Sequence, residues 1–251
     1  TFLLLPFGPE VDIAGHVTKL VVVDSDAAIL VFLGLASLGV YSLVLAGYSS
    51  NNKWSLLGAI RASAQLISYE LALTTAVVCA LLPAATMNLS EVVDYQRAHL
   101  WQALTQPIGF FVFLVASFAE TNRLPFDLPE AESELVAGYH TEYGSMRFAM
   151  FFMGEYMSMT TLSALAVTLY FGGWSLPFVD FSGFSGLVQA LLGFGVIMAK
   201  VGLFLFLFIW VRWTFPRFRY DQLMRIGWKI LLPLAFLQFV ITAGLVVGGA
   251  L

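Results

Sequence analysis

The sequence predicts an all-α polytopic membrane protein. Of its 251 residues, 59% are hydrophobic and only 11% are charged. Apolar runs of roughly 18 or more residues recur along the chain, and a helix of about that length crosses the ~30 Å hydrocarbon core of a bilayer. A β-barrel is disfavoured, because its segments would be shorter and would alternate in polarity.

We expect about six complete transmembrane helices, preceded by the end of another. The chain opens with TFLLLPFGPE, which is typical of the last turns of a hydrophobic helix. The six expected spans cover residues 27–47, 64–82, 104–119, 147–171, 187–211 and 229–250. Residues 88–103 are too polar to span a bilayer and predict an interfacial amphipathic helix or loop.

The basic residues predict the orientation of these spans. Six spans place the loops at 48–63, 120–146 and 212–228 on one side. Including helix ends, that side carries nine basic residues: Lys53, Arg61, Arg123, Arg147, Arg212, Arg217, Arg219, Arg225 and Lys229. The other side carries Lys19 and Arg97, so the positive-inside rule places the loop at 120–146 in the cytoplasm, or in the matrix of a mitochondrion.

An acidic segment at 119–147 separates two of the apolar spans. It holds six of the sixteen acidic residues: Glu120, Asp127, Glu130, Glu132, Glu134 and Glu142. Pro125 and Pro129 prevent one continuous helix, and a short helix is predicted from Glu130 to a stop at Gly138. A solvated acidic loop is the simplest interpretation, and here His140 would be a solvated partner. The glutamates in the flanking helices favour a functional loop instead.

Four ionisable residues fall in or at the ends of the spans, where a charge costs several kcal/mol unless it is paired or hydrated. They are Glu70, Glu120, Glu155 and Lys200. We expect Glu70 to lie about two turns inside its helix, with Thr74 as a hydrogen-bond partner. Lys200 has apolar helical neighbours and is expected to face a carboxylate or water on another helix. The group is either a buried ion pair that sets helix registry or a proton or charge relay.

The sequence contains no motif for a redox centre. Cys79 is the single cysteine, lies in an apolar run and is expected to be a small core residue. No haem, flavin or nucleotide motif is present, no metal site is predicted, and no basic patch indicates nucleic acid. Any redox centre is therefore expected on another chain.

Several segments carry a resemblance to a known family. AETNR, PFDLPEAESELVAG and HTEY lie in the acidic segment, LLGAIRASAQLISYE lies at 56–70, and PRFRYDQLM lies at 216–224. Together they resemble the H subunit of the proton-pumping NADH:quinone oxidoreductase (respiratory complex I), the counterpart of mitochondrial NADH dehydrogenase subunit 1. The resemblance implies that residues 1–251 form a single membrane domain without the family's N-terminal helix and amphipathic segment.

The resemblance also implies roles for particular residues. A carboxylate channel, to which Lys200 is added from its place in a span, contains Glu70, Glu120, Glu130, Glu132, Glu142 and Glu155. The positions implied for the quinone cavity are Arg61, Gln65, Arg123, Phe126 and Asp127. Arg123 would stabilise a reduced or anionic quinone or pair with a carboxylate, and Phe126 is expected to pack rather than to stack on quinone.

A basic segment is implied to contact the peripheral arm of the complex. Its residues are Arg217, Arg219, Tyr220 and Asp221. The alternative is a positive-inside anchor in which Asp221 pairs with an arginine.

The implied function is quinone chemistry without a cofactor on this chain. Quinone is the substrate, while FMN and iron–sulfur clusters belong to partner subunits. Expected partners are the peripheral-arm iron–sulfur subunits, small membrane subunits, antiporter-like subunits and the lipid bilayer. We expect the bacterial plasma membrane rather than the mitochondrial inner membrane. The alternatives are the homologous component of a membrane-bound hydrogenase or formate hydrogenlyase, an independent ion-coupled transporter, and a passive membrane anchor.

Overall fold

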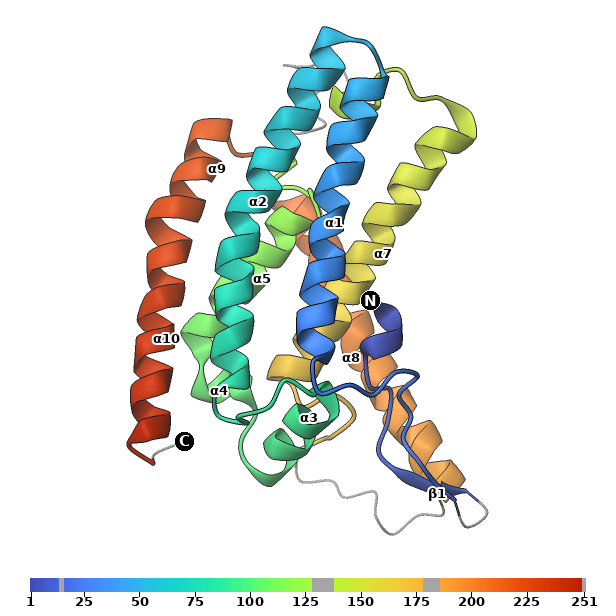
Figure 1. The fold of residues 1–251 in the computed structure, drawn as a ribbon, viewed down its shortest axis with the longest axis vertical. Helices are drawn as coiled ribbons and strands as arrows, with labels where there is room; N and C mark the ends of the chain where they lie inside the picture. Colours follow the sequence, from blue (N-terminus) through green and yellow to red (C-terminus); the bar gives the residue numbers. More distant parts are fainter. Residues whose placement is uncertain (14–15, 128–137, 178–185, 250–251) are drawn as a thin grey trace.

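A computed structural model describes residues 1–13, 16–127, 138–177 and 186–249. It is a bundle of long helices, which confirms the predicted all-α polytopic membrane fold (Figure 1). Among the described residues, four helices are long and apolar enough to cross a membrane. They are α1 (Ala28–Ser49), α2 (Lys53–Leu81), α8 (Gly186–Thr214) and the helix Tyr220–Val247.

Two more helices occupy the remaining predicted spans. Helix α5 (Pro107–Glu120) is apolar but has only 14 residues, and α7 (Ser145–Tyr170) has 26. The first half of α7 carries Arg147 and Glu155, and hydroxyl side chains follow, so its composition is more polar than that of the four long apolar helices. Both helices lie where the sequence predicted them, and their membership of the spanning set stays a prediction.

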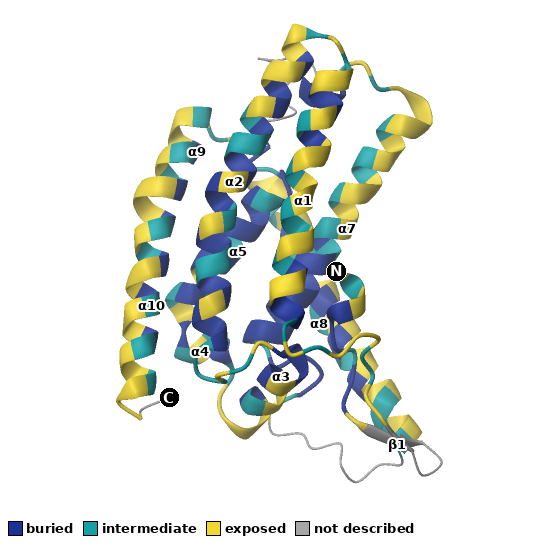
Figure 2. Ribbon diagram, in the orientation of Figure 1, coloured by how far each residue is buried: buried dark blue, intermediate teal, exposed yellow. Residues whose placement is uncertain are grey.

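Helix α2 is the centre of the bundle. It packs against α1, α5 and α10, and most of its apolar length is buried (Figure 2). In contrast, α1, α8 and α10 (Leu232–Val247) expose most of their large apolar side chains, as helices at the rim of a membrane bundle do. Small side chains on α2 permit this packing: Ala59, Ala62, Ala72 and Ala76 are fully buried.

Two helices begin earlier than predicted. Helix α2 starts at Lys53 rather than near residue 64, because Asn52 caps it by accepting the N–H of Trp54 at 3.0 Å. The last helix starts at residue 220 as α9 (Tyr220–Ile226) and continues through a π-helical turn, η3 (Gly227–Leu231), into α10. Pro233 lacks an N–H, which accounts for a widened turn just before it.

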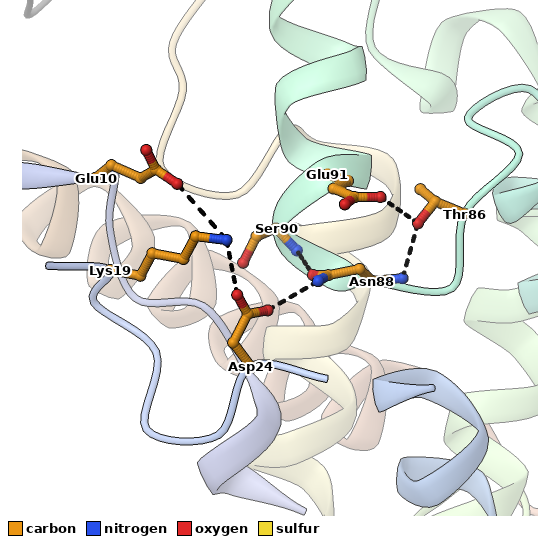
Figure 3. Close-up of polar contacts among 7 residues, drawn as sticks. All are labelled: Glu10, Lys19, Asp24, Thr86, Asn88, Ser90 and Glu91. Atoms are coloured by element: carbon orange, nitrogen blue, oxygen red, sulfur yellow. Dashed lines mark hydrogen bonds and ion pairs between the residues drawn. The ribbon is translucent and has the colours of Figure 1, made fainter. Parts of the chain in front are cut away.

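The N-terminal part departs slightly from an all-α fold. After the 3₁₀ turn η1 (Phe2–Leu4), strands β1 (Val11–Ile13) and β2 (His16–Thr18) form an antiparallel pair. Helix α3 (Leu89–Ala98) and the single turn α4 (Gln102–Thr105) take the place of the predicted amphipathic segment. Lys19 Nζ donates to Asp24 at 2.7 Å, and Asn88 Nδ2 donates to Asp24 at 2.8 Å, so polar contacts join the ribbon region to the start of α3 (Figure 3).

The connections gather at two ends of the bundle (Figure 1). One end holds the α1–α2 turn, residues 121–127, the 3₁₀ turn η2 (Gly138–His140) and the start of α9. These are the loops expected on the basic side, and we call this the basic end. The opposite end holds the ribbon, α3, α4, residues 171–177 and the end of α10.

Candidate functional site

Gln65 fixes the first part of the acidic segment. Residues 121–127 are not helical, as Pro125 predicted, and they fold over the side of α2. The fully buried Gln65 Nε2 donates to the carbonyls of Ala119 and Phe126, both at 2.9 Å, and lies 3.3 Å from Asn122 Oδ1. This predicted quinone-site residue therefore clamps the segment to α2.

Phe126 is buried among other rings. Its centroid lies 5.8 Å from that of Tyr69 and 5.6 Å from that of Phe218. Tyr69 in turn donates its hydroxyl to the carbonyl of Leu223 at 2.9 Å, which ties α2 to α9. Phe126 therefore packs against the protein, as expected.

The basic segment before α9 contacts the acidic segment directly. Arg217 Nη2 donates to Asp127 Oδ2 at 2.9 Å, and the N–H of Phe218 donates to Pro125 O at 3.1 Å. The anchor interpretation expected Asp221 to pair with an arginine, but Arg217 pairs with Asp127 of the acidic segment. Asp221 lies exposed in the first turn of α9.

Two further members of the predicted site lie beside this contact. The guanidinium of Arg61 lies 5.8 Å from the centre of the Tyr220 ring, a cation–π distance. Arg219 is exposed at the N-cap of α9, where its N–H donates to Gln222 Oε1 at 3.3 Å. The fold thus brings the implied quinone positions and the implied docking segment together at the basic end.

Arg123 forms a buried ion pair with Glu155 of α7. The atoms Nη2 and Oε2 lie 3.2 Å apart, and the side chains are 7% and 12% exposed. The guanidinium lies over the ring of Tyr156, 4.5 Å from its centre, and Tyr139 donates its hydroxyl to Glu155 Oε1 at 3.1 Å. Of the two interpretations of Arg123, the structure bears out pairing with a carboxylate.

Glu70 and Glu120 lie close to each other on α2 and α5. Each feels the charge of the other, and Ser37 of α1 donates a hydrogen bond to Glu70 in place of the expected Thr74. Since α2 starts at Lys53, Glu70 lies deeper than two turns, 17 residues or about 26 Å from the helix start. Within the described ranges, Glu120 Oε2 is buried and has no hydrogen-bond partner.

A cavity of about 670 Å³ joins these carboxylates. It lies between α1, α7 and the end of α5, and its walls are mainly apolar, with Phe32, Leu43, Phe151 and others. Glu120 and Glu155 both line it. Such a space suits an apolar molecule with a polar head, and the buried carboxylates beside it suit proton exchange.

Other predicted members of the carboxylate line lie elsewhere. Glu142 is exposed at the surface of the basic end, where Asn52 Nδ2 donates to its Oε1 at 2.8 Å. Glu130 and Glu132 lie in 128–137, outside the described residues, as does most of the predicted helix that ends at Gly138.

Lys200 meets main-chain carbonyls, so the prediction of a carboxylate or water as its partner is wrong. Its Nζ donates to three carbonyls just beyond the end of α7: Phe171 at 2.7 Å, Gly173 at 2.8 Å and Ser175 at 2.6 Å. The ammonium also lies 4.9 Å from the centre of the Trp101 ring. The carbonyls at a helix C-terminus attract a cation, so they replace the expected counter-ion. Phe171 lies 16 residues, or about 24 Å of helix, beyond Glu155.

Sequence reasoning missed several residues of the site. Tyr139 is buried and contacts Glu155, and its carbonyl accepts the hydroxyl of Ser55 at 2.8 Å. His140, expected to be solvated, is buried instead, with its ring 5.2 Å from that of Phe148. The aromatic residues that follow the acidic run were the available signal, since buried rings often accompany a buried charge.

Comparisons with known proteins agree with this arrangement. A family model described as NADH dehydrogenase matches residues 1–243. A protein of Protochlamydia amoebophila described as the H subunit of NADH-quinone oxidoreductase is 50% identical over 242 residues, which cover 96% of this chain and 70% of the relative. This chain belongs to the family of NADH-quinone oxidoreductase H subunits.

Other members of this family are similarly close. A Cytophaga hutchinsonii protein, described as number 1 of its NADH-quinone oxidoreductase H subunits, is 45% identical over 239 residues, or 95% of this chain and 70% of the relative. A Rhodothermus marinus protein described as NADH-quinone oxidoreductase subunit 8 is 52% identical over 233 residues, or 89% of this chain and 68% of the relative. The family resemblance carried by the motifs is therefore confirmed.

Proposed function

We propose that this chain forms part of the quinone cavity of a proton-translocating NADH:quinone oxidoreductase and couples quinone reduction to proton movement. The observation that carries the proposal is the position of Glu120 and Glu155 on the wall of one apolar cavity. The names of the relatives support the reaction, and the four apolar helices support a place in a membrane. We place the chain in the bacterial plasma membrane.

The chain acts on quinone without a redox centre of its own. FMN and iron–sulfur clusters on partner subunits supply electrons, and the cavity holds the apolar quinone. Reduction of a quinone to a quinol takes up two electrons and two protons, so negative charge develops unless protons arrive with the electrons. Arg123 balances Glu155 at this point, and the clamp made by Gln65 holds the 121–127 segment rigid.

The proton path runs through Glu155, Glu120 and Glu70. Glu120 is the pivotal member, because it lines the cavity and also feels the charge of Glu70. A change of charge in the cavity thus alters Glu120, and Glu120 alters Glu70 behind it. Lys200 is left out of this path, because carbonyls at the opposite end of α7 bind it.

The exposed part of the basic end is the docking face for the peripheral arm. Arg219 and Asp221 point to solvent there, while Arg217 is held by Asp127 of the acidic segment. A partner that binds this face would therefore also contact the support of the quinone loop.

Purification of the tagged chain tests the proposed assembly. The protein, extracted in mild detergent, is expected to bring down iron–sulfur subunits and an inhibitor-sensitive NADH:quinone reductase activity. A chain that purifies with a hydrogenase would favour the homologous component of a hydrogenase or formate hydrogenlyase. A chain that purifies alone and transports ions without a redox donor would favour an independent transporter. Either result would contradict the proposal.

Substitution of Glu120 tests the proton path. Glu120→Gln keeps the size of the side chain and removes its proton exchange, so NADH-driven quinone reduction and proton pumping should fall at least about tenfold in a complex that still assembles. Glu10→Gln is the matched control, since Glu10 is exposed at the opposite end. Wild-type rates in an assembled Glu120→Gln complex would count against the path.

A further inference from the structure

Two buried glutamines lie at the opposite end of the bundle from the carboxylates. Gln102 is 1% exposed and Gln106 is not exposed. They are one helical turn apart, since the N–H of Gln106 donates to the carbonyl of Gln102 at 2.8 Å. All four side-chain amide atoms are buried, and none has a hydrogen-bond partner among the described residues. Buried polar groups without partners are rare in native proteins, so this pair calls for a ligand.

Gly109 leaves room for that ligand. A Cβ atom placed on Gly109 would lie 3.4 Å from Gln238 Cγ, 3.7 Å from Gln106 Oε1 and 3.8 Å from the hydroxyl oxygen of Tyr170. These are ordinary contact distances, so the side of Gly109 holds a space the size of one heavy atom. Tyr170 donates its hydroxyl to Ala76 O at 3.0 Å, which leaves its oxygen free to accept.

The chemistry of the unpartnered atoms selects the ligand. The two amide nitrogens need acceptors, whereas the two amide oxygens need donors. A cation would satisfy only the oxygens, and an anion would satisfy only the nitrogens. Water both donates and accepts, and a buried water commonly makes about three hydrogen bonds to otherwise unpaired groups. We propose that Gln102, Gln106 and Tyr170 bind ordered water beside Gly109.

This site is separate from the cavity of the carboxylates. Along α5, Gly109 precedes Glu120 by 11 residues, or about 17 Å. Val112, Phe113 and Ala116 lie between them and are fully buried or nearly so. An apolar layer therefore divides the water site from Glu120, and the proposal does not depend on quinone chemistry.

Two glycine substitutions test the water site by thermal unfolding of the purified assembly. Gly202→Ala on α8 has no neighbour within 4 Å and reports the helix preference of alanine alone. If water occupies the site, the methyl group of Gly109→Ala displaces it, and the midpoint falls at least about 3 °C below that of Gly202→Ala. If the site is dry, the methyl group fits at contact distance and the two variants match, which would overturn the proposal.

Two glutamine substitutions and a map provide independent tests. Gln106→Met should lower the midpoint relative to Gln189→Met, whose glutamine is half-buried on α8. A rise would show that the amide is dry, because an apolar group of similar shape relieves an unpaired one. A cryo-EM map of the wild-type assembly that resolves water should show density within hydrogen-bonding distance of Gln106 and Tyr170. A well-ordered map without that density would also overturn the proposal.

Discussion

Two buried cations at the two ends of α7 are balanced in different ways. Arg123 at the basic end meets the carboxylate of Glu155 and the face of Tyr156. Lys200 toward the opposite end meets three main-chain carbonyls and the face of Trp101. Each combines an oxygen partner with an aromatic ring, so the decisive difference is whether that oxygen belongs to a carboxylate or to the backbone.

This difference separates a site that can change its charge from one that cannot. Glu155 can gain or lose a proton, so the balance at Arg123 can shift during a reaction. Carbonyl dipoles do not titrate in this range, so Lys200 keeps one environment and acts as a cap on the end of α7. The comparison therefore predicts that Lys200 matters for stability and that the carboxylate cluster matters for activity.

The largest effect on stability is expected from Lys200→Met. The substitution removes three charge-assisted hydrogen bonds and leaves buried carbonyls without those donors, which should cost about 3–5 kcal/mol. The amount of assembled complex and its thermal midpoint should fall, while the rate per assembled complex stays near that of the wild type. Lys229→Met, on an exposed lysine, is the control. A stable Lys200→Met protein would remove the contrast between the two cations.

A smaller effect is expected from the ion pair at the basic end. Arg123→Met leaves the Glu155 carboxylate buried without its cation, which should cost about 2–4 kcal/mol. Adding Glu155→Gln removes that charge, so the double variant should unfold at a higher temperature than Arg123→Met alone. A double-mutant cycle on the thermal midpoint measures this coupling. Strictly additive effects would mean that the two side chains do not interact energetically.

The smallest effect is expected where a lysine is exposed. Lys19 Nζ lies 2.7 Å from Asp24 and 3.6 Å from Glu10, at side chains that are 33–60% exposed (Figure 3). Asp24→Asn should therefore cost less than about 1 kcal/mol, and salt should erase much of the difference. A loss of several kcal/mol that persists in high salt would show that exposure does not set the scale.

The same contact has a predictable pH dependence. Hydrogen bonds from Lys19 and Asn88 lower the pKa of Asp24 below its usual value of 3.8. A lowered pKa means that the contribution to stability is complete above pH ~4 and is lost as pH falls through the folded-state pKa. Unfolding of Asp24→Asn and of the wild type, followed between pH 7 and 3, should therefore converge only at the acid end.

The sequence predicted the helices and the cluster better than the partners within it. Long apolar runs located the helices, and glutamates near span ends placed Glu70, Glu120 and Glu155 at one region of the fold. The partners were harder to predict, because they come from segments far away in the chain. Asp127 pairs with a residue 90 positions later, and Lys200 binds carbonyls whose exposure depends on where α7 ends. Helical periodicity carries no information on either contact.

The most direct test compares Glu120→Gln with Lys200→Met in proteoliposomes. NADH oxidation and proton translocation are measured on equal amounts of assembled complex, with Glu10→Gln as the common control. We predict that Glu120→Gln assembles normally but loses most quinone reduction and pumping, whereas Lys200→Met assembles poorly and retains both rates per complex. Normal pumping in Glu120→Gln together with lost pumping in Lys200→Met would contradict the account.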